Sequence, residues 1–123
     1  MTAWFDIETD RAKGLLRLTM GGFYDAAAVS RLHTALVEAV AALGCAPNAH
    51  RTLCDIAAMN IQSQDMVTTF AALVGSPDIR SRRLAFVTGA TLARLQARRL
   101  TDRPGVDFFT DAEAALAWLL EPD

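Results

Sequence analysis

The first twenty residues contain two short runs in which apolar and polar side chains alternate. Residues 3–10 alternate acidic and large apolar side chains, and residues 15–20 alternate leucine and methionine with polar residues. A period of two is typical of a strand with one buried face. The polar turn between the runs predicts an antiparallel hairpin whose first strand lies at a sheet edge. Gly21 and Gly22 are then expected to turn the backbone sharply.

A helix over residues 26–43 is predicted by apolar side chains that recur every three or four positions. Asp25 is a residue type that caps helix N-termini, and Gly44 is a residue type that ends helices. His33 falls at the edge of the apolar stripe, where a lone histidine is usually a packing or surface residue. Pro47 prevents the helix from continuing into the next segment.

The centre of the chain is predicted to be a buried strand, a loop and the start of a helix. Residues 52–56 are apolar apart from Thr52 and Asp55. This composition is typical of an interior strand covered on both faces, and Asp55 is expected to close it. Ser63 should cap a second helix over residues 64–74, which Gly75 should end in a left-handed conformation. Asp55 and Ser63 would then border one crevice.

The second half of the chain predicts two more strands and two more helices. Residues 84–87 form the most hydrophobic strand, and a third helix is expected over residues 91–100. Residues 106–109 read as the last strand, and Thr110-Asp-Ala-Glu113 reads as a capping box for a final helix over residues 111–120. That helix is expected to bury Ala112, Leu116, Leu119 and Leu120.

The order is therefore β-β-α-β-α-β-α-β-α over a single domain, residues 1–123. It predicts an α/β fold with a mixed sheet packed by helices, in which the later strands are parallel. The length of 123 residues and the 52% share of hydrophobic residues are typical of one core. No signal-like N-terminus and no uncharged apolar run of about 20 residues occurs, so we expect a soluble, cytoplasmic protein without a transmembrane segment.

The net charge of −2 conceals an uneven distribution. Residues 80–103 contain seven arginines and one acidic residue. Arginines that precede strands, or follow the third helix, should gather at the amino-end rim of the sheet, across the molecule from Asp55. We call this set the basic rim: Arg51, Arg80, Arg82, Arg83, Arg98, Arg99 and Arg103.

Such a rim could dock an acidic protein, a phospholipid headgroup or nucleic acid. No aromatic residue is interleaved with the arginines, which argues against nucleic acid as a partner. The other interpretation is structural, because cations at a helix C-terminus complement its dipole.

Four stretches carry a family resemblance: Gly21-Gly22-Phe23, Leu53-Cys-Asp-Ile with Ser63, Arg83-Leu-Ala-Phe-Val-Thr-Gly, and Phe109-Thr-Asp-Ala-Glu-Ala-Ala-Leu-Ala-Trp-Leu119. Together they resemble the anti-sigma-factor-antagonist (STAS) fold group. Within that group they resemble the SpoIIAA-like branch related to the Sec14/CRAL-TRIO lipid-binding proteins. The resemblance covers nearly the whole chain.

In phosphoregulated STAS members, a serine at the start of the helix after the central strand is phosphorylated, and this controls docking on a regulator. The resemblance therefore implies Ser63 as a candidate phosphorylation site. The motif usually reads Asp-Ser-Ser-Gly, whereas here the same place reads Ile61-Gln-Ser-Gln64. The resemblance supports the fold better than this switch, and Ser63 as a helix cap alone is the other interpretation.

In parallel α/β sheets, ligands bind beyond the carboxyl ends of the strands. The residues expected at that end form a candidate crevice: Gly21, Gly22, Asp55, Ser63, Thr88, Gly89, Thr91 and Thr110. The turn over residues 88–91 offers backbone N–H groups that could hold an anion. Neither GxxxxGK[ST] nor GxGxxG occurs, so the sequence supports no nucleotide pocket of these types.

Patterns for catalysis and metal binding do not occur in the sequence. Asp55 stands alone at its strand end, and Cys54 should face the opposite side of the sheet. Cys45 and Cys54 lack metal-ligand spacing and are expected to be reduced and half-buried. We therefore expect no catalytic residues, no metal and no cofactor. An anion-handling enzyme at Asp55 and Thr88 is the least favoured alternative.

The leading hypothesis is a non-catalytic STAS-like regulatory module that acts through a protein partner or as a homodimer. Trp118 is expected to lie off the buried stripe of the final helix, and exposed tryptophans often anchor interfaces. The alternative is a small carrier that holds an apolar or lipid-like small molecule between helices and sheet, as the Sec14-like resemblance implies. Such a carrier would need a pocket of a few hundred cubic ångströms.

Overall fold

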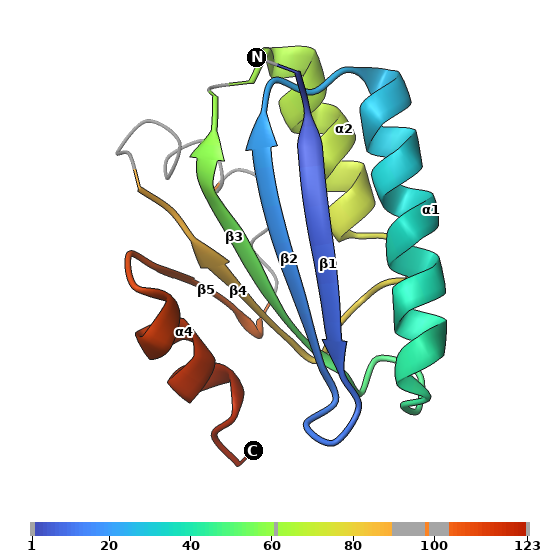
Figure 1. Cartoon of the computed structure of the whole chain (residues 1–123), viewed down its shortest axis with the longest axis vertical. Helices are drawn as coiled ribbons and strands as arrows, with labels where there is room; N and C mark the ends of the chain where they lie inside the picture. The colour runs from blue at the N-terminus through green and yellow to red at the C-terminus, as the bar shows by residue number, and fades with distance from the viewer. Residues whose placement is uncertain (1, 61, 90–97, 99–103, 123) are drawn as a thin grey trace.

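The described part of the chain forms a five-stranded sheet with helices on both faces (Figure 1). The computed structural model describes residues 2–60, 62–89, 98 and 104–122. Its elements are β1 (Trp4–Asp10), β2 (Leu15–Gly22), α1 (Ala26–Leu43), β3 (Arg51–Met59), α2 (Gln64–Val74), β4 (Arg83–Val87), β5 (Val106–Phe109) and α4 (Ala112–Leu119). The helix expected over residues 91–100 lies outside the described residues, apart from Arg98.

The strands follow one another across the sheet in chain order, β1 to β5. The hairpin partners β1 and β2 are antiparallel, whereas every later neighbouring pair is parallel. β1 lies at the edge, and its acidic side chains alternate with apolar ones that pack toward the core. The mixed sheet and its edge hairpin are therefore confirmed.

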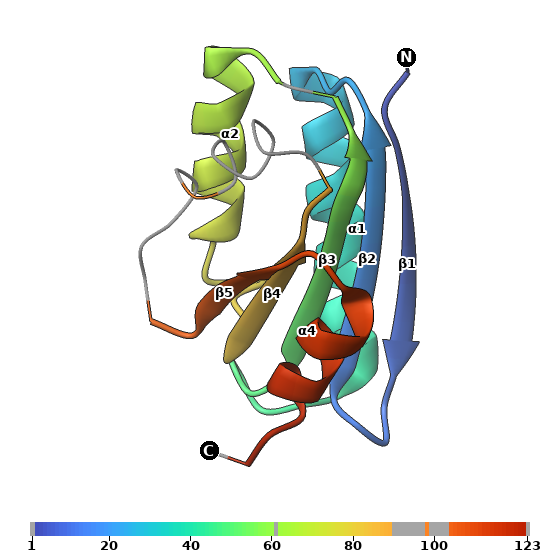
Figure 2. The same ribbon diagram turned by 90° about the vertical axis from the view of Figure 1, so that its left-hand side faces the viewer.

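The sheet separates two hydrophobic cores of unequal size. Figures 1 and 2 show α1 and α2 on one face of the sheet and α4 on the other. The central strands contribute side chains to both cores, because neighbouring residues of a strand face opposite sides of the sheet. Leu84 and Phe86 of β4, for example, join the α1/α2 core, while Ala85 and Val87 join the α4 core.

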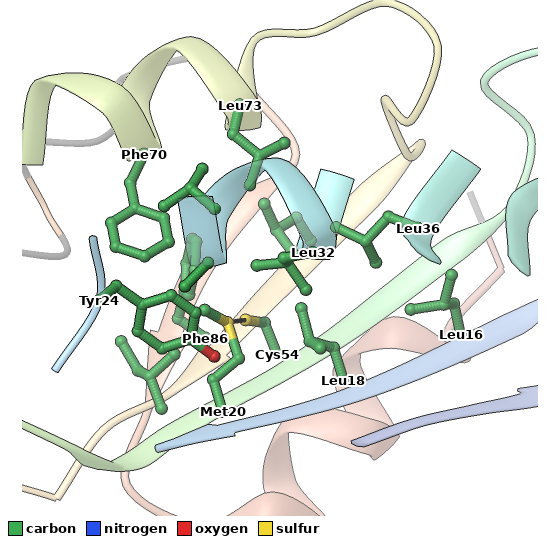
Figure 3. Close-up of a cluster of buried hydrophobic side chains, with 14 of the residues drawn as sticks. Leu16, Leu18, Met20, Tyr24, Leu32, Leu36, Cys54, Phe70, Leu73 and Phe86 are labelled. Carbon is green, nitrogen blue, oxygen red and sulfur yellow. Dashed lines mark hydrogen bonds between the residues drawn. The ribbon is translucent and has the colours of Figure 1, made fainter. Parts of the chain in front are cut away.

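The α1/α2 core is the larger of the two clusters (Figure 3). Leucines from β2 and α1 form its centre, and Tyr24 packs edge-on against Phe70 of α2 with ring centroids 5.4 Å apart. The Cys54 thiol points at the Met20 sulfur, 3.8 Å away. Cys54 is thus a buried core residue and Cys45 is exposed, so the expectation that both are half-buried is wrong.

Side-chain caps begin α1 and α2 where the sequence predicts them. An Asp25 carboxylate oxygen accepts the Ala28 N–H at 2.8 Å, and Ser63 Oγ accepts the Met66 N–H at 3.2 Å. Gly44 ends α1 in the left-handed region at φ 68°. Gly75 was expected to do the same, but its φ is −82°. Its N–H bonds to carbonyls of the last turn of α2, so no left-handed residue is needed there.

The final helix differs from the prediction in both its cap and its buried side. Asp111, rather than Thr110, is the N-cap and accepts two backbone N–H groups. The buried residues are Ala115 and Leu119, whereas Leu120 is exposed. Trp118 turns toward the sheet, with its ring 5.6 Å from that of Phe109. This contact removes the observation behind the homodimer hypothesis, so the oligomeric state stays a prediction.

The central strand β3 is longer than predicted. Asp55 was expected to end it, but the strand continues to Met59 and pairs with the last two residues of β2. The pairing register shifts between Thr19 and Gly21, which marks a bulge in β3 just after Asp55. Asp55 therefore does not end β3, although it pairs with Val87, the last residue of β4.

α1 is long and apolar enough to cross a membrane by length and composition alone. It packs against β1, β2 and α2 and contributes Leu32 and Leu36 to the core. Core helices pass the same test, so this composition does not show a transmembrane segment.

Candidate functional site

Two glycines shape the end of the sheet at which β2 and β3 finish, which we call the carboxyl pole. Gly21 and Gly22 do not make the predicted turn; they lie within β2 and pair with Ala58 and Met59. A Cβ on Gly21 would overlap the Trp4 indole. A Cβ on Gly22 would overlap the Thr2 carbonyl, and Gly22 has a φ of 83°. Both positions need glycine because other parts of the chain come so close.

The carboxyl pole leaves two aromatic rings in solvent. Trp4 is 41% exposed and Phe23 is 48% exposed, and they are the most exposed large hydrophobic residues of the described chain. Trp4 begins β1 opposite Gly21, and Phe23 directly follows β2, so both lie at the same end of the sheet. The sequence analysis did not identify either residue as part of a site. The alternation of β1 did predict that Trp4 faces away from the main core.

A buried glutamine holds this end of the molecule together. Gln62 donates to the Gly22 carbonyl at 3.1 Å and accepts the Tyr24 N–H at 2.9 Å. The Tyr24 hydroxyl in turn donates to the Trp4 carbonyl at 2.6 Å. Burial raises the pKa of Tyr24 to about 12, with a smaller contribution from Cys54. These bonds join the starts of β1, α1 and α2 into one unit.

Ser63 lies at the carboxyl pole on an exposed helix start. It precedes α2, and its hydroxyl accepts the Met66 N–H. Asp65 adds a negative charge in the same first turn, where the helix dipole favours it. The structure thus confirms Ser63 as a cap, and its phosphorylation remains a prediction.

The structure does not bring Asp55 and Ser63 to one crevice. Asp55 shares its side of β3 with Leu53, which belongs to the α4 core, whereas α2 covers the opposite face. An Asp55 carboxylate oxygen accepts the Ala57 N–H at 3.0 Å, at the bulge of β3. Asp55 therefore stabilises an irregular stretch of backbone within its own strand.

Thr88 and Gly89 follow β4 at the carboxyl pole. The Thr88 N–H donates to the Phe109 carbonyl at 2.9 Å, and its side chain is buried. Gly89 is exposed and lies beside Ala57. Thr91 is outside the described residues, so the predicted anion site at 88–91 stays a prediction. Thr110 is exposed at the end of β5.

The cysteine and histidine side chains are dispersed. Cys54 faces the α1/α2 core, opposite to Asp55, and burial raises the pKa of its thiol to about 12, helped by the nearby Asp55 charge. His33 Nε2 lies 3.1 Å from the Asp78 carboxylate on the surface. Hydrogen bonds from Ser76 and then His33 lower the pKa of Asp78. Among the described residues, no three His, Cys, Asp or Glu side chains are grouped to hold a metal ion.

The opposite end of the sheet, where β3 and β4 begin, is the amino pole, and four arginines of the basic rim lie there. Arg51 and Arg83 are direct neighbours across β3 and β4, and Arg80 and Arg82 immediately precede β4. Asp55 follows Arg51 by four residues on the same side of the strand, which is about 13 Å. Asp55 pairs with Val87, the last residue of β4, so Asp55 and the Arg51/Arg83 pair lie at opposite ends of the β3/β4 ladder, as predicted.

Two rim arginines are engaged by aromatic rings. The Arg83 guanidinium lies 5.2 Å from the Trp118 ring centroid, donates to the Trp118 carbonyl and lies 3.8 Å from the Glu121 carboxylate. The Arg98 guanidinium lies 4.9 Å from the Phe108 ring, over the middle of β5, not at the rim. Arg99 and Arg103 are outside the described residues. For Arg83, the structure shows a packing role.

Known proteins resemble this chain in fold. No family model matches the chain, and no curated protein matches it. The crystal structure of an anti-sigma factor antagonist from Mycobacterium paratuberculosis is similar, with a TM-score of 0.68 and 13% identity over 98% of this chain and 96% of that one. An uncharacterised protein with a SpoIIAA-like fold from Shewanella loihica has a TM-score of 0.66 and 23% identity over 95% and 93%. This chain has a STAS/SpoIIAA-like fold.

The similarity extends over nearly the whole chain and confirms the fold resemblance inferred from the four sequence stretches. At sequence identities of 13% and 23%, the similarity to these two structures establishes the fold and no function.

Proposed function

We propose that this protein is a non-catalytic regulatory module that docks a protein partner at its carboxyl pole. The exposure of Trp4 and Phe23 at one end of the sheet is the observation that carries the proposal. Tryptophan and other aromatic side chains are frequent anchors of protein interfaces. The similarity to an anti-sigma factor antagonist supports a regulatory protein interaction.

The two aromatic residues are attached to rigid backbone. The Trp4 ring lies over the bare backbone of Gly21, and the Trp4 carbonyl is held by the Tyr24 hydroxyl. Phe23 lies between Gly22 and Tyr24, which Gln62 ties together. A preorganised anchor loses little conformational entropy when a partner binds. These restraints support a docking role for exposed rings.

Ser63 lies at the same pole and is our candidate for control of docking. A phosphate there would add negative charge at the N-terminus of α2, where unpaired N–H groups and the helix dipole favour it. It would also place that charge at the pole that carries the two aromatic rings. Phosphorylated Ser63 should therefore change the affinity for the partner.

Affinity capture from the native host tests the proposal. The wild-type chain should retain a partner that Phe23→Ser loses, while Val37→Ser should retain it. Val37 is also an exposed apolar residue, 37% accessible, but it lies on α1. Equal capture by all three chains would refute the carboxyl pole as the docking face.

A second candidate function is a small-molecule carrier, and one observation favours it. A cavity of about 110 Å³ lies between the sheet and the helices α1 and α2. Leucines from β2, α1 and α2 line it, together with aromatic rings from α2 and β4. Native mass spectrometry of the purified protein should detect a bound small molecule if the protein is a carrier.

A further inference from the structure

The cavity between the sheet and α1/α2 is too small for the lipid that the sequence resemblance implies. Its volume is about 110 Å³, whereas sites for drug-sized ligands take about 300 Å³ or more. It is also smaller than an apolar cavity of about 150 Å³ that holds a benzene ring in another protein. The second candidate function, on which this inference rests, is therefore limited to a ligand of one ring at most.

One wall of the cavity carries a buried histidine. His50 is 2% exposed and lines the cavity, just ahead of β3. Its Nε2 has no hydrogen-bond partner among the described residues. Buried polar atoms are nearly always paired, so an unpaired ring nitrogen beside a cavity indicates a missing partner.

The state of the His50 ring defines what that partner must supply. Burial lowers the pKa of His50, which favours the neutral ring. A hydrogen bond to the Ile79 backbone acts in the opposite direction, as a ring N–H that donates to a carbonyl does. Since Nε2 has no partner in the described part of the chain, the nitrogen that donates is Nδ1, and the neutral ring leaves Nε2 as an acceptor. Its missing partner must be a donor.

The other residues that line the cavity are mostly apolar and favour a ligand that is itself mostly apolar. Leu32, Leu36, Phe70 and Leu73 project into this core from the helices, and Leu18 faces them from the sheet (Figure 3). Thr52 and Ser81, both buried, share the lining with His50. A molecule that fills this space gains from burial of nearly all its apolar surface.

We propose that the cavity binds a small apolar molecule with one hydroxyl group, no larger than phenol, whose hydroxyl donates to Nε2 of His50. The apolar body would lie among the leucine and phenylalanine side chains. Neither Trp4 nor Phe23 lines this cavity. The site would work whether or not the carboxyl pole docks a protein.

Phenol and toluene test the proposal because they have nearly the same shape and differ in the donor. We would follow the His50 ring nitrogens of the wild-type protein by NMR while each compound is added. Phenol should shift the Nε2 resonance in the direction of an accepted hydrogen bond, and toluene should not. This measurement needs no variant, so it does not depend on the folding of one.

The affinities then test the role of His50. The ratio of phenol affinity to toluene affinity should fall about tenfold in His50→Leu, which loses the acceptor. In His33→Leu, whose histidine is outside the cavity lining, the ratio should be unchanged. Leu36→Phe should weaken both compounds because the larger ring fills the cavity.

Two results would overturn the inference in different ways. If both compounds bind and His50→Leu leaves the ratio unchanged, the cavity is an apolar site without a histidine contact. The carrier function would then stand without this inference. If neither compound binds and the His50 resonances do not move, the cavity takes no ligand of this size, and the carrier function fails as well.

Discussion

The two ends of the sheet differ in which side chains are exposed and which are packed against the protein. At the carboxyl pole, Trp4 and Phe23 remain in solvent although large apolar rings are normally stabilised by burial. At the amino pole, charged Arg83 turns inward against the ring and the carbonyl of Trp118. The comparison teaches that a run of arginines in the sequence is not by itself an interaction face. The proposed docking surface is based instead on exposed rings that are held on rigid backbone.

The largest effect should come from Gly22, because the carboxyl pole depends on close backbone approach there. Gly22→Ala combines a left-handed φ with an overlap on the Thr2 carbonyl. We expect the free energy of unfolding to fall by about 3 kcal/mol. Urea denaturation measures this. Gly89→Ala is the control, since its Cβ would meet Ala57 at an ordinary 3.6 Å, and a similar loss in both variants would contradict the account.

Tyr24 makes the carboxyl pole sensitive to high pH. Its folded-state pKa of about 12 lies above the ordinary value of 10, so the folded state favours the neutral hydroxyl. That stabilisation is complete below pH 10 and is lost as the pH rises toward 12. The unfolding free energy should fall over this interval by up to about 2 kcal/mol. Tyr24→Phe should remove this part of the pH dependence; an identical pH profile in both proteins would disprove the assignment.

Arg83 tests the opposite half of the comparison. Arg83→Met keeps an apolar stem but loses the ring contact and the hydrogen bond to Trp118. We expect a loss of about 1.5 kcal/mol in stability, and no loss of partner capture. Arg31→Met, on the exposed side of α1, should change stability by less than about 0.5 kcal/mol. Lost capture with Arg83→Met at unchanged stability would mean that the amino pole is the docking face.

Ser63 gives the smallest effect on stability and separates its two interpretations. Ser63→Ala should cost about 1 kcal/mol, whereas Ser63→Asp should be nearly neutral because aspartate caps helices equally well. Thermal unfolding measures both. If Ser63 also controls docking, Ser63→Asp should weaken partner capture despite its normal stability. Unchanged capture would leave Ser63 as a helix cap alone.

Most of the fold could be predicted because local periodicity and tertiary packing agree. The alternating runs at 3–10 and 15–20 became the edge hairpin, and the caps at Asp25 and Ser63 began helices as expected. The length of β3 was missed because pairing with Gly21 and Gly22 extends it past a bulge. In the sequence, two glycines after a strand predict a turn. The packing of Trp4 and Thr2 against them is visible only in the folded structure.

The candidate site was less predictable for the same reason. A glutamine beside a helix cap normally reads as exposed, yet Gln62 is buried and bonds to residues about forty positions away. α4 is apolar on several sides, so its sequence alone did not decide that Trp118 would turn toward Arg83. Asp55 was expected to end β3, which continues beyond the bulge. Each error concerns a partner distant in sequence, which local patterns do not specify.

Site-specific photo-cross-linking tests the central claim most directly. A p-benzoyl-phenylalanine residue would replace Phe23 at the carboxyl pole in one protein and the exposed Arg82 at the amino pole in another. Both proteins would be irradiated in the native host. The account predicts a defined cross-linked partner from position 23 and none from position 82. A partner captured from position 82 alone would contradict it.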